Sequence, residues 1–297
     1  MHTSFIYGLV VQSELPLLDP IPSNREPEVT VRFGSLAHIA VEPDTRHSIL
    51  IKLPLEVKFL IRNGCHILID APPTVDRAIP RTHILGAAMA FILRQRGFLV
   101  LHASCVARND QAIAFLGGSG WGKSTLASWF HQQGYRLMTD DVMAIRMDTS
   151  GAQVIPSFPE VKLLPDAAAV LETASESLPL LHSLSHKQIR RLDGQFALHP
   201  VPIQQLYVLR AGSYTDIEPI SRAQSFTELV QHSRAAKMLG DPTVMIQHFH
   251  QCSQLAKTVP MAYLKRPRSL QQLSQVLACV EKHLQIHPPY AEIGDRH

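Results

Sequence analysis

The chain has 297 residues, of which 45% are hydrophobic and 18% charged, a composition typical of a globular protein with one large domain or two small ones. The formal net charge is only +3, and lysine and arginine are scattered along the chain, which argues against a nucleic-acid partner. The N-terminus lacks the basic start of a signal peptide, and the most apolar helical run, 84–93, is too short to cross a bilayer. We therefore expect a cytoplasmic protein with no membrane partner.

The four cysteines support the same location. They show neither a C-x-x-C pair nor the spacing of a zinc site, which indicates small apolar residues in a reducing compartment. They are Cys65, Cys105, Cys252 and Cys279.

Residues 1–82 are predicted to form a small β-rich domain, followed by a second domain over 83–297. Short runs rich in Val, Ile and Phe and bounded by turn residues predict strands at 5–11, 29–34, 48–53, 57–63 and 66–71. This region contains no set of catalytic residues. Because an exposed strand edge accepts an extended peptide by adding a strand, we expect the first domain to serve as a peptide-docking site.

The second domain is predicted to be mixed α/β. A helix is expected at 82–97, ending at Gly97, and the strand runs 98–107 and 111–116 are expected to pair as a hairpin around RND. Further along the chain, the predicted elements are a helix after the glycine-rich segment, a strand pair at 135–147, a helix at 165–176, a strand at 203–210, helices at 224–239 and 269–284, and a frayed tail at 287–297.

The segment FLGGSGWGKST, 115–125, carries the main functional signal. A turn-forming loop explains the glycines but not the lysine after them, whereas Gly117-x-x-x-x-Gly122-Lys123-Ser124 fills every fixed position of the P-loop pattern. In that pattern backbone N–H groups wrap the phosphates of a nucleotide, the lysine reaches the β and γ oxygens, and the serine hydroxyl binds Mg²⁺. The predicted nucleotide-binding residues are Gly117, Gly118, Ser119, Gly120, Trp121, Gly122, Lys123, Ser124 and Thr125.

An acidic pair follows the next apolar strand. Asp140 and Asp141 would point to opposite faces if the strand continued, so that one would meet the magnesium ion and the other the acceptor group. The residues themselves do not say which aspartate takes which role. The alternative is a pair of solvated carboxylates in a turn, although no glycine or proline marks a turn there.

The segments VLHASCVA, GGSGWGKST and GYRLMTDDV together resemble the kinase domain of bacterial HPr kinase/phosphorylase. His102 stands 21 residues before Lys123, and Asp141 stands 18 residues after it, in agreement with that family. The resemblance implies an ATP- and Mg²⁺-dependent serine kinase in which His102, Lys123, Asp140 and Asp141 are catalytic. It assigns the metal ligand and the base to the acidic pair, and we expect Ser124 and Asp140 to hold the metal. Without the resemblance, a lone histidine in an apolar strand is more often a core residue.

Outside this core the sequence departs from that family. VIPSFPEVKLLPDAAAVL replaces the segment associated with phosphorylase activity, so the resemblance does not extend to reverse phosphorolysis, which the sequence leaves open. The layout of the whole chain is similar to HPr-kinase-related proteins found beside peptide-maturation genes, including lasso-peptide kinases. That similarity implies that the acceptor is a serine of a precursor peptide.

Other functions stay open at this point. They are a serine kinase of an HPr-type carrier protein, a P-loop ATPase or GTPase, and a nucleotide-dependent peptide-binding module. GTPases usually carry an Asn-Lys-x-Asp segment, which this chain lacks. Homo-oligomerisation is also left open. One further cation is expected at the site, from the set Lys162, Lys187, Arg190 and Arg191.

Overall fold

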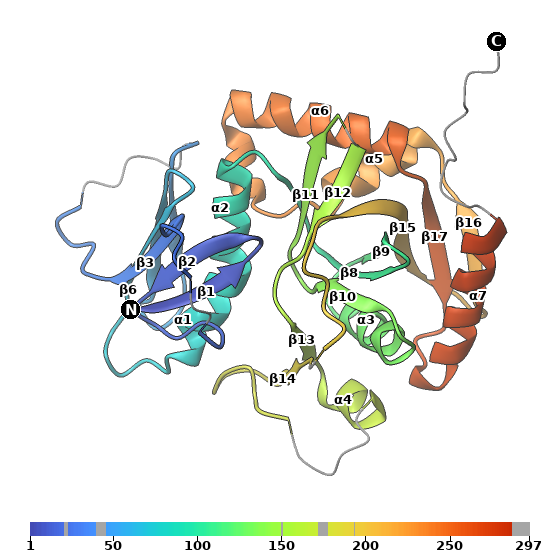
Figure 1. Cartoon of the computed structure of the whole chain (residues 1–297), viewed down its shortest axis with the longest axis horizontal. Coiled ribbons are helices and arrows are strands. Elements are labelled where there is room, and N and C mark those ends of the chain that lie inside the picture. The colour runs from blue at the N-terminus through green and yellow to red at the C-terminus, as the bar shows by residue number, and fades with distance from the viewer. Residues whose placement is uncertain (21–22, 40–45, 150, 172–177, 193, 287–297) are drawn as a thin grey trace.

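The computed structural model describes residues 1–297 except 21–22, 40–45, 150, 172–177, 193 and 287–297. Within the described residues the chain forms a six-stranded sheet, a nine-stranded sheet and a two-stranded sheet, with helices packed against them. The predicted mixed α/β class with a β-rich N-terminal region is confirmed. Figure 1 shows the N-terminal strands on one side of the molecule and the larger sheet on the other.

The six-stranded sheet contains the N-terminal strands in the order β1-β2-β3-β6-β5-β4. Their bounds are β1 (His2–Ile6), β2 (Leu9–Ser13), β3 (Val29–Phe33), β4 (Ser48–Lys52), β5 (Lys58–Arg62) and β6 (His66–Asp70). Four of the five predicted runs form one strand each. The first run, 5–11, instead forms a hairpin, because Tyr7 and Gly8 adopt positive φ values of 56° and 73° and close a tight two-residue turn.

A continuous helical segment lies between the two large sheets (Figure 1). It consists of α1 (Ala78–His83), a π-helical stretch η1 (Ile84–Ala88) and α2 (Met89–Gln95), and so begins earlier than the predicted helix. Its apolar residues join one core with residues of both sheets, as Phe59 of β5, Ile92 of α2 and Ala144 in the larger sheet illustrate. The boundary near residue 82 falls inside α1 and stays a prediction. None of the described helices has the length and apolar character needed to cross a membrane.

The nine-stranded sheet carries the glycine-rich loop. Its main path is β10-β8-β9-β15-β12-β11-β7, and β17 joins β15 and β16. The bounds are β7 (Leu99–Leu101), β8 (Ala103–Arg108), β9 (Gln111–Leu116), β10 (Arg136–Thr139), β11 (Met143–Asp148), β12 (Gly151–Ile155), β15 (Val201–Ala211), β16 (Asp216–Pro219) and β17 (Met261–Arg266). The β8–β9 hairpin predicted around RND is confirmed, with Asn109 and Asp110 at positive φ in its turn. Strands β9, β15 and β17 are parallel, so their carboxyl ends meet at one edge.

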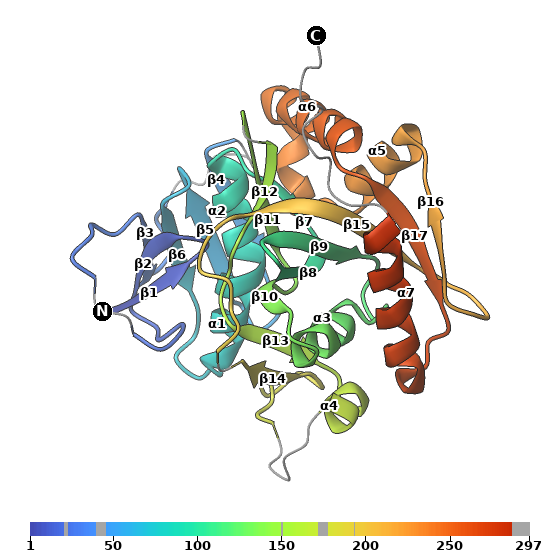
Figure 2. The same cartoon turned by 45° about the vertical axis from the view of Figure 1, so that its right-hand side comes forward.

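Helices cover both faces of this sheet (Figures 1 and 2). Because strand residues alternate between faces, Phe115 of β9 packs with α3 (Lys123–Gln132) and α7 (Leu273–Ile286), whereas its neighbour Leu116 lies in the core formed with α5 (Arg222–Gln231) and α6 (Pro242–Thr258). The remaining elements are β13 (Glu160–Leu163), α4 (Pro165–Leu171), β14 (Gln188–Arg191), η2 (Ala236–Gly240) and η3 (Leu270–Gln272).

Several predicted elements differ from the structure. Strands β10 and β11 do not pair with each other, because β10 pairs with β8 whereas β11 lies between β7 and β12. The predicted helix at 224–239 is broken after Gln231, and Ala235 there has a positive φ of 55°. Helix α6 and strand β17 were not anticipated. The helix predicted at 165–176 is observed over Pro165–Leu171, and the rest of that prediction lies outside the described residues.

The remaining predictions concern the C-terminal end of the chain and the four cysteines. The helix predicted at 269–284 is observed as η3 followed by α7, and the predicted tail at 287–297 lies outside the described residues. Cys105 and Cys252 are buried, as expected, whereas Cys65 and Cys279 are only half-buried.

Candidate active site

The glycine-rich loop links β9 to α3, as the P-loop pattern requires. Its last glycine, Gly122, caps the helix with φ at 82°, a left-handed conformation that favours glycine. A Cβ atom at this position would lie 2.4 Å from Nη2 of Arg266, so a side chain would also collide with the end of β17. The N-cap residue of α3 makes no side-chain hydrogen bond to the helix, and the backbone N–H groups at the start of a helix bind phosphate.

Lys123 is folded into this loop. Its ammonium group donates hydrogen bonds to the carbonyl oxygens of Gly117 (2.8 Å) and Gly118 (2.9 Å), and it lies 2.9 Å from Nε2 of His102. The residue is 6% exposed, and burial lowers the pKa of its ammonium group to about 8 against the opposing effect of nearby aspartates. A bound polyphosphate would supply the negative charge that favours the protonated amine.

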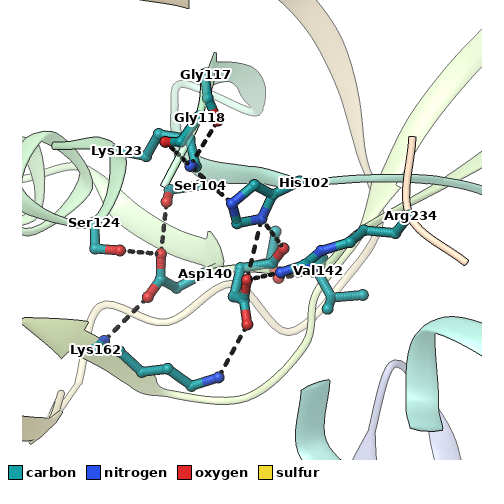
Figure 3. Close-up of polar contacts among 12 residues, drawn as sticks. His102, Ser104, Gly117, Gly118, Lys123, Ser124, Asp140, Val142, Lys162 and Arg234 are labelled. Carbon is teal, nitrogen blue, oxygen red and sulfur yellow. Dashed lines mark hydrogen bonds and ion pairs between the residues drawn. The ribbon is translucent and has the colours of Figure 1, made fainter. Parts of the chain in front are cut away.

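Asp140 faces the start of α3 (Figure 3). Its Oδ1 accepts hydrogen bonds from the hydroxyls of Ser104 (2.5 Å) and Ser124 (2.8 Å), and its Oδ2 accepts one from the backbone N–H of Lys162 (3.0 Å). A carboxylate and a hydroxyl in contact are hard oxygen ligands of the kind that Mg²⁺ prefers beside nucleotide phosphates. The predicted ligands Ser124 and Asp140 thus lie together and fit a magnesium ion chemically.

Asp141 lies in a tight turn rather than in a strand. Strand β10 ends at Thr139, and Asp141 itself adopts a positive φ of 75°. The expectation that the two carboxylates point to opposite faces of a continuing strand is therefore wrong. The turn is held because the hydroxyl of Thr139 donates to the carbonyl oxygen of Val142 (2.6 Å). Both carboxylates line the same pocket as a result.

Three cationic or hydrogen-bonding side chains surround the Asp141 carboxylate. Figure 3 labels all three, His102, Lys162 and Arg234. Nζ of Lys162 lies 3.1 Å from Oδ2, Arg234 pairs with Oδ1, and Nδ1 of His102 lies 3.1 Å from Oδ1. Burial by itself raises the pKa of Asp141. The hydrogen bond from His102 and the charges of Lys162 and Arg234 outweigh burial and hold that pKa well below its ordinary value. Asp141 is therefore ionised at neutral pH.

His102 connects the P-loop lysine to Asp141. It stands where the predicted strand 98–107 divides into β7 and β8, and its backbone N–H donates to the carbonyl oxygen of His232 (2.7 Å). Its Nδ1 faces two acceptors, the backbone oxygen (3.0 Å) and Oδ1 of Asp141. This network assigns the ring proton to Nδ1, which leaves Nε2 as an acceptor for the ammonium group of Lys123.

Arg234 and Ser104 were missed at the level of sequence. Arg234 lies far along the chain from the P-loop, in the break after α5, and no spacing pattern marks it. Its backbone N–H donates to Val100 (2.8 Å), and its own carbonyl oxygen accepts from the buried guanidinium of Arg94 (3.0 Å). Arg94 in turn contacts Nδ1 of His248 (3.2 Å) on α6. A buried network beneath the site therefore fixes the segment that carries Arg234.

The predicted set of additional cations divides in two. Lys162 contacts both aspartates, and Lys187 lines the pocket. Arg190 and Arg191 are not among the described residues that line it, and Arg191 pairs instead with Asp19. The pocket is lined by the predicted residues from Ser119 to Thr125 together with His102, Asp140, Asp141, Lys162, Leu164, Asp166, Ala167, Lys187, Arg266, Arg268, Ser269 and Leu270.

The fold and this site define a P-loop protein of mixed α/β class. No family model matches the chain, and no curated protein matches it. Among solved structures, it is similar to the Hpr(Ser) kinase/phosphatase from Coxiella burnetii, with 10% sequence identity and a TM-score of 0.33. The match covers 63% of this chain and 97% of that chain. Similarity at this level shows neither activity nor substrate, so the side chains of the site must carry the function.

Proposed function

We propose that the protein is an ATP-dependent serine kinase that transfers the γ-phosphate to a serine of a peptide or small protein. One observation carries the proposal. The P-loop lysine shares one pocket with three groups of the proposed chemistry. Ser124 and Asp140 are a pair of the kind that binds a metal, and Asp141 is an ionised candidate for the base. Phosphoryl transfer requires these components: a phosphate cradle, a metal site, a group that orients the nucleophile, and cations.

The P-loop end of the pocket would hold the nucleotide. Backbone N–H groups at the start of α3 would receive the phosphates, and Lys123 would exchange its two carbonyl partners for the β and γ oxygens. Ser124 and Asp140 would hold the magnesium ion, which neutralises phosphate charge when bound. Ser104 would keep the Asp140 carboxylate oriented, because its buried hydroxyl donates to Oδ1.

Asp141 would act on the acceptor. In the transfer step the serine oxygen forms a bond to the γ-phosphorus, the bond from that phosphorus to the β–γ bridging oxygen breaks with its electron pair leaving on ADP, and the serine proton passes to Asp141. His102 would orient this carboxylate through Nδ1. Lys162 and Arg234, which now neutralise Asp141, lie where they could turn to the transferred group and stabilise its spread negative charge.

Within this class we favour a precursor peptide of a maturation pathway, of the lasso-peptide kind, over a folded carrier protein. The support for this choice is the layout of motifs along the whole sequence. A disordered peptide presents a serine without a fixed surface around it, which suits a pocket that lies at the edge of a sheet.

Mass spectrometry of candidate peptides incubated with the protein, ATP and Mg²⁺ tests the proposal. We expect a gain of one phosphate on serine, its absence when that serine is replaced by alanine, and its absence with the Lys123→Ala variant. Release of inorganic phosphate without labelling of any peptide or carrier protein would instead indicate an ATPase. Nucleotide binding with neither reaction would indicate a binding module.

A further inference from the structure

One side of the pocket takes no part in the transfer chemistry described above. It is formed where β17 ends, at Arg266, and by the following residues Arg268 and Leu270, all of which line the pocket. Trp121 of the P-loop faces this side. The acidic pair and Lys162 belong to other elements, the turn after β10 and strand β13.

Arg266 joins this wall to the P-loop. Its buried guanidinium donates from Nη2 to the backbone oxygen of Trp121 (2.9 Å) and from Nη1 to the backbone oxygen of Pro267 (3.2 Å). The same Nη2 occupies the space that a Cβ atom at Gly122 would need. The end of β17 is thereby held against the turn that precedes α3, so the wall and the phosphate cradle pack together as one unit.

Arg268 and Trp121 form a flat, cationic surface on this unit. The guanidinium carbon of Arg268 lies 4.4 Å from the centre of the Trp121 ring. The indole is also backed by the loop, because a Cβ atom at Gly118 would lie 3.0 Å from its Cδ1 and Nε1 atoms. Arg268 itself is exposed. An arginine that covers an indole in this way leaves the outer side of its guanidinium plane for another flat group.

The topology places this surface within reach of a nucleotide. Strands β9, β15 and β17 run parallel, and ligands of open α/β sheets bind beyond the carboxyl ends of such strands. The phosphate cradle follows β9, and β17 lies two strands away, roughly 10 Å along the edge of the sheet. A ribose and a base extending from the α-phosphate bridge a distance of this order.

We propose that the Trp121–Arg268 pair is the platform on which the base of the bound nucleotide stacks. The proposal rests on the nucleotide site of the proposed function and adds the group that recognises the base. The recognition would use the flat face of a purine against a guanidinium backed by an aromatic ring. The base would thus lie at the β17 side of the pocket, away from Asp141, and leave that side open for the acceptor serine.

Titration calorimetry of the full chain with Mg²⁺–ATP and with Mg²⁺–triphosphate, which has no base, tests the platform. We expect the wild-type protein to bind ATP more tightly than triphosphate. Trp121→Ala and Arg268→Gln should weaken ATP binding by roughly 10- to 100-fold and triphosphate binding by less than about threefold, because only the base contact is lost. Trp121→Phe should keep most of the preference for ATP.

Arg222→Gln is the matched control, since it removes the same charge from α5, outside the pocket, and should change neither affinity. Equal losses for ATP and triphosphate in the Arg268→Gln variant would make Arg268 a phosphate ligand and overturn the platform. Unchanged ATP affinity in both Trp121→Ala and Arg268→Gln would overturn it as well. Thermal melting of each variant verifies that the fold is retained.

These measurements need no acceptor, so they separate the platform from the kinase proposal. A protein that prefers ATP through Trp121 and Arg268 but labels no serine would support the platform and refute the kinase. A wild-type protein that binds neither ATP nor triphosphate would refute the nucleotide site, and the platform with it.

Discussion

The two large sheets differ in where they place their charged side chains. In the N-terminal sheet, β5 buries its apolar centre and keeps Lys58 and Arg62 at its half-exposed ends. In the nine-stranded sheet, the segments that meet at one edge bury Lys123, Asp140 and Arg266, each no more than 6% exposed. Burying charged groups is costly unless partners compensate, and proteins concentrate that cost at functional sites. The comparison favours a functional site on the larger sheet. The peptide-docking role expected of residues 1–82 stays a prediction.

One contact links the smaller sheet directly to the site. The buried hydroxyl of Tyr7, in the turn of the first hairpin, donates to the backbone oxygen of Val142 (2.7 Å), immediately after the acidic pair. The backbone N–H of Tyr7 also donates to the carbonyl oxygen of Ser157 (3.4 Å). The N-terminal sheet thus contacts the acidic turn, although none of its described residues lines the pocket.

Of the substitutions considered, loss of the P-loop lysine in the larger sheet's site should reduce phosphoryl transfer the most. We expect Lys123→Ala to reduce phosphoryl transfer by at least about 10³-fold and to weaken ATP binding, because the charge that pairs with the β and γ oxygens is lost. Rates of ATP-dependent peptide labelling and calorimetric ATP affinity measure the two effects. Lys257→Ala, on the exposed face near the end of α6, is the control. Undiminished turnover in Lys123→Ala would refute the P-loop assignment.

Neutralising the aspartates one at a time should separate the two ends of the site. Asp141→Asn should keep ATP affinity within about threefold and lower the transfer rate by about 10²- to 10³-fold, because the base is lost. Asp140→Asn should raise the Mg²⁺ concentration needed for half-maximal ATP binding, because a metal ligand is lost. Magnesium titrations of ATP binding and single-turnover labelling measure both. If both variants lost ATP affinity equally, the two roles would not be separable.

Lowering the pH should destabilise the protein through the buried network of Arg94 and His248. Burial, assisted by the charge of Arg94, lowers the pKa of His248 to about 4. Between that value and the ordinary 6.5 the unfolded chain binds more protons than the folded one, so the free energy of unfolding should fall as pH decreases through this window. We expect this group to contribute about 1 to 3 kcal/mol of the loss. Urea unfolding of wild-type and His248→Gln at several pH values measures it, and parallel pH profiles would contradict the prediction.

The smallest effect is expected where the smaller sheet meets the site. Tyr7→Phe removes one buried hydroxyl and leaves the Val142 carbonyl with its bond from Thr139, so the free energy of unfolding should fall by only about 1 kcal/mol. Transfer rates should stay within about twofold. A transfer rate reduced well beyond twofold, with the fold retained, would show that the N-terminal sheet controls the acidic turn. The contrast drawn between the two sheets would then be wrong.

Local patterns predicted much of the fold because they depend on near neighbours. The strand runs at 29–34, 48–53, 57–63 and 66–71 and the β8–β9 hairpin follow from apolar residues bounded by turn residues. The strand at 5–11 failed because Tyr7, an unusual residue at positive φ, closes a turn inside an apolar run. The start of helix α6 carries a local sequence signal that the strand and helix predictions did not use. Asp241 caps the helix and Pro242 occupies its first turn.

For the candidate site, the sequence alone determined the glycine-rich loop, because Gly117 to Ser124 is a contiguous motif whose loop and helix form locally. It also marked His102, Asp140, Asp141 and Lys162, but not their arrangement.

Tertiary structure decided that arrangement. The left-handed turn at Asp141 turns its carboxylate toward His102, the segment after α5 brings Arg234 across from β7, and the end of β17 carries Arg268 to Trp121. Each of these contacts joins residues far apart in the chain, and the topology of the sheet, rather than any local preference, determines which distant loops share an edge.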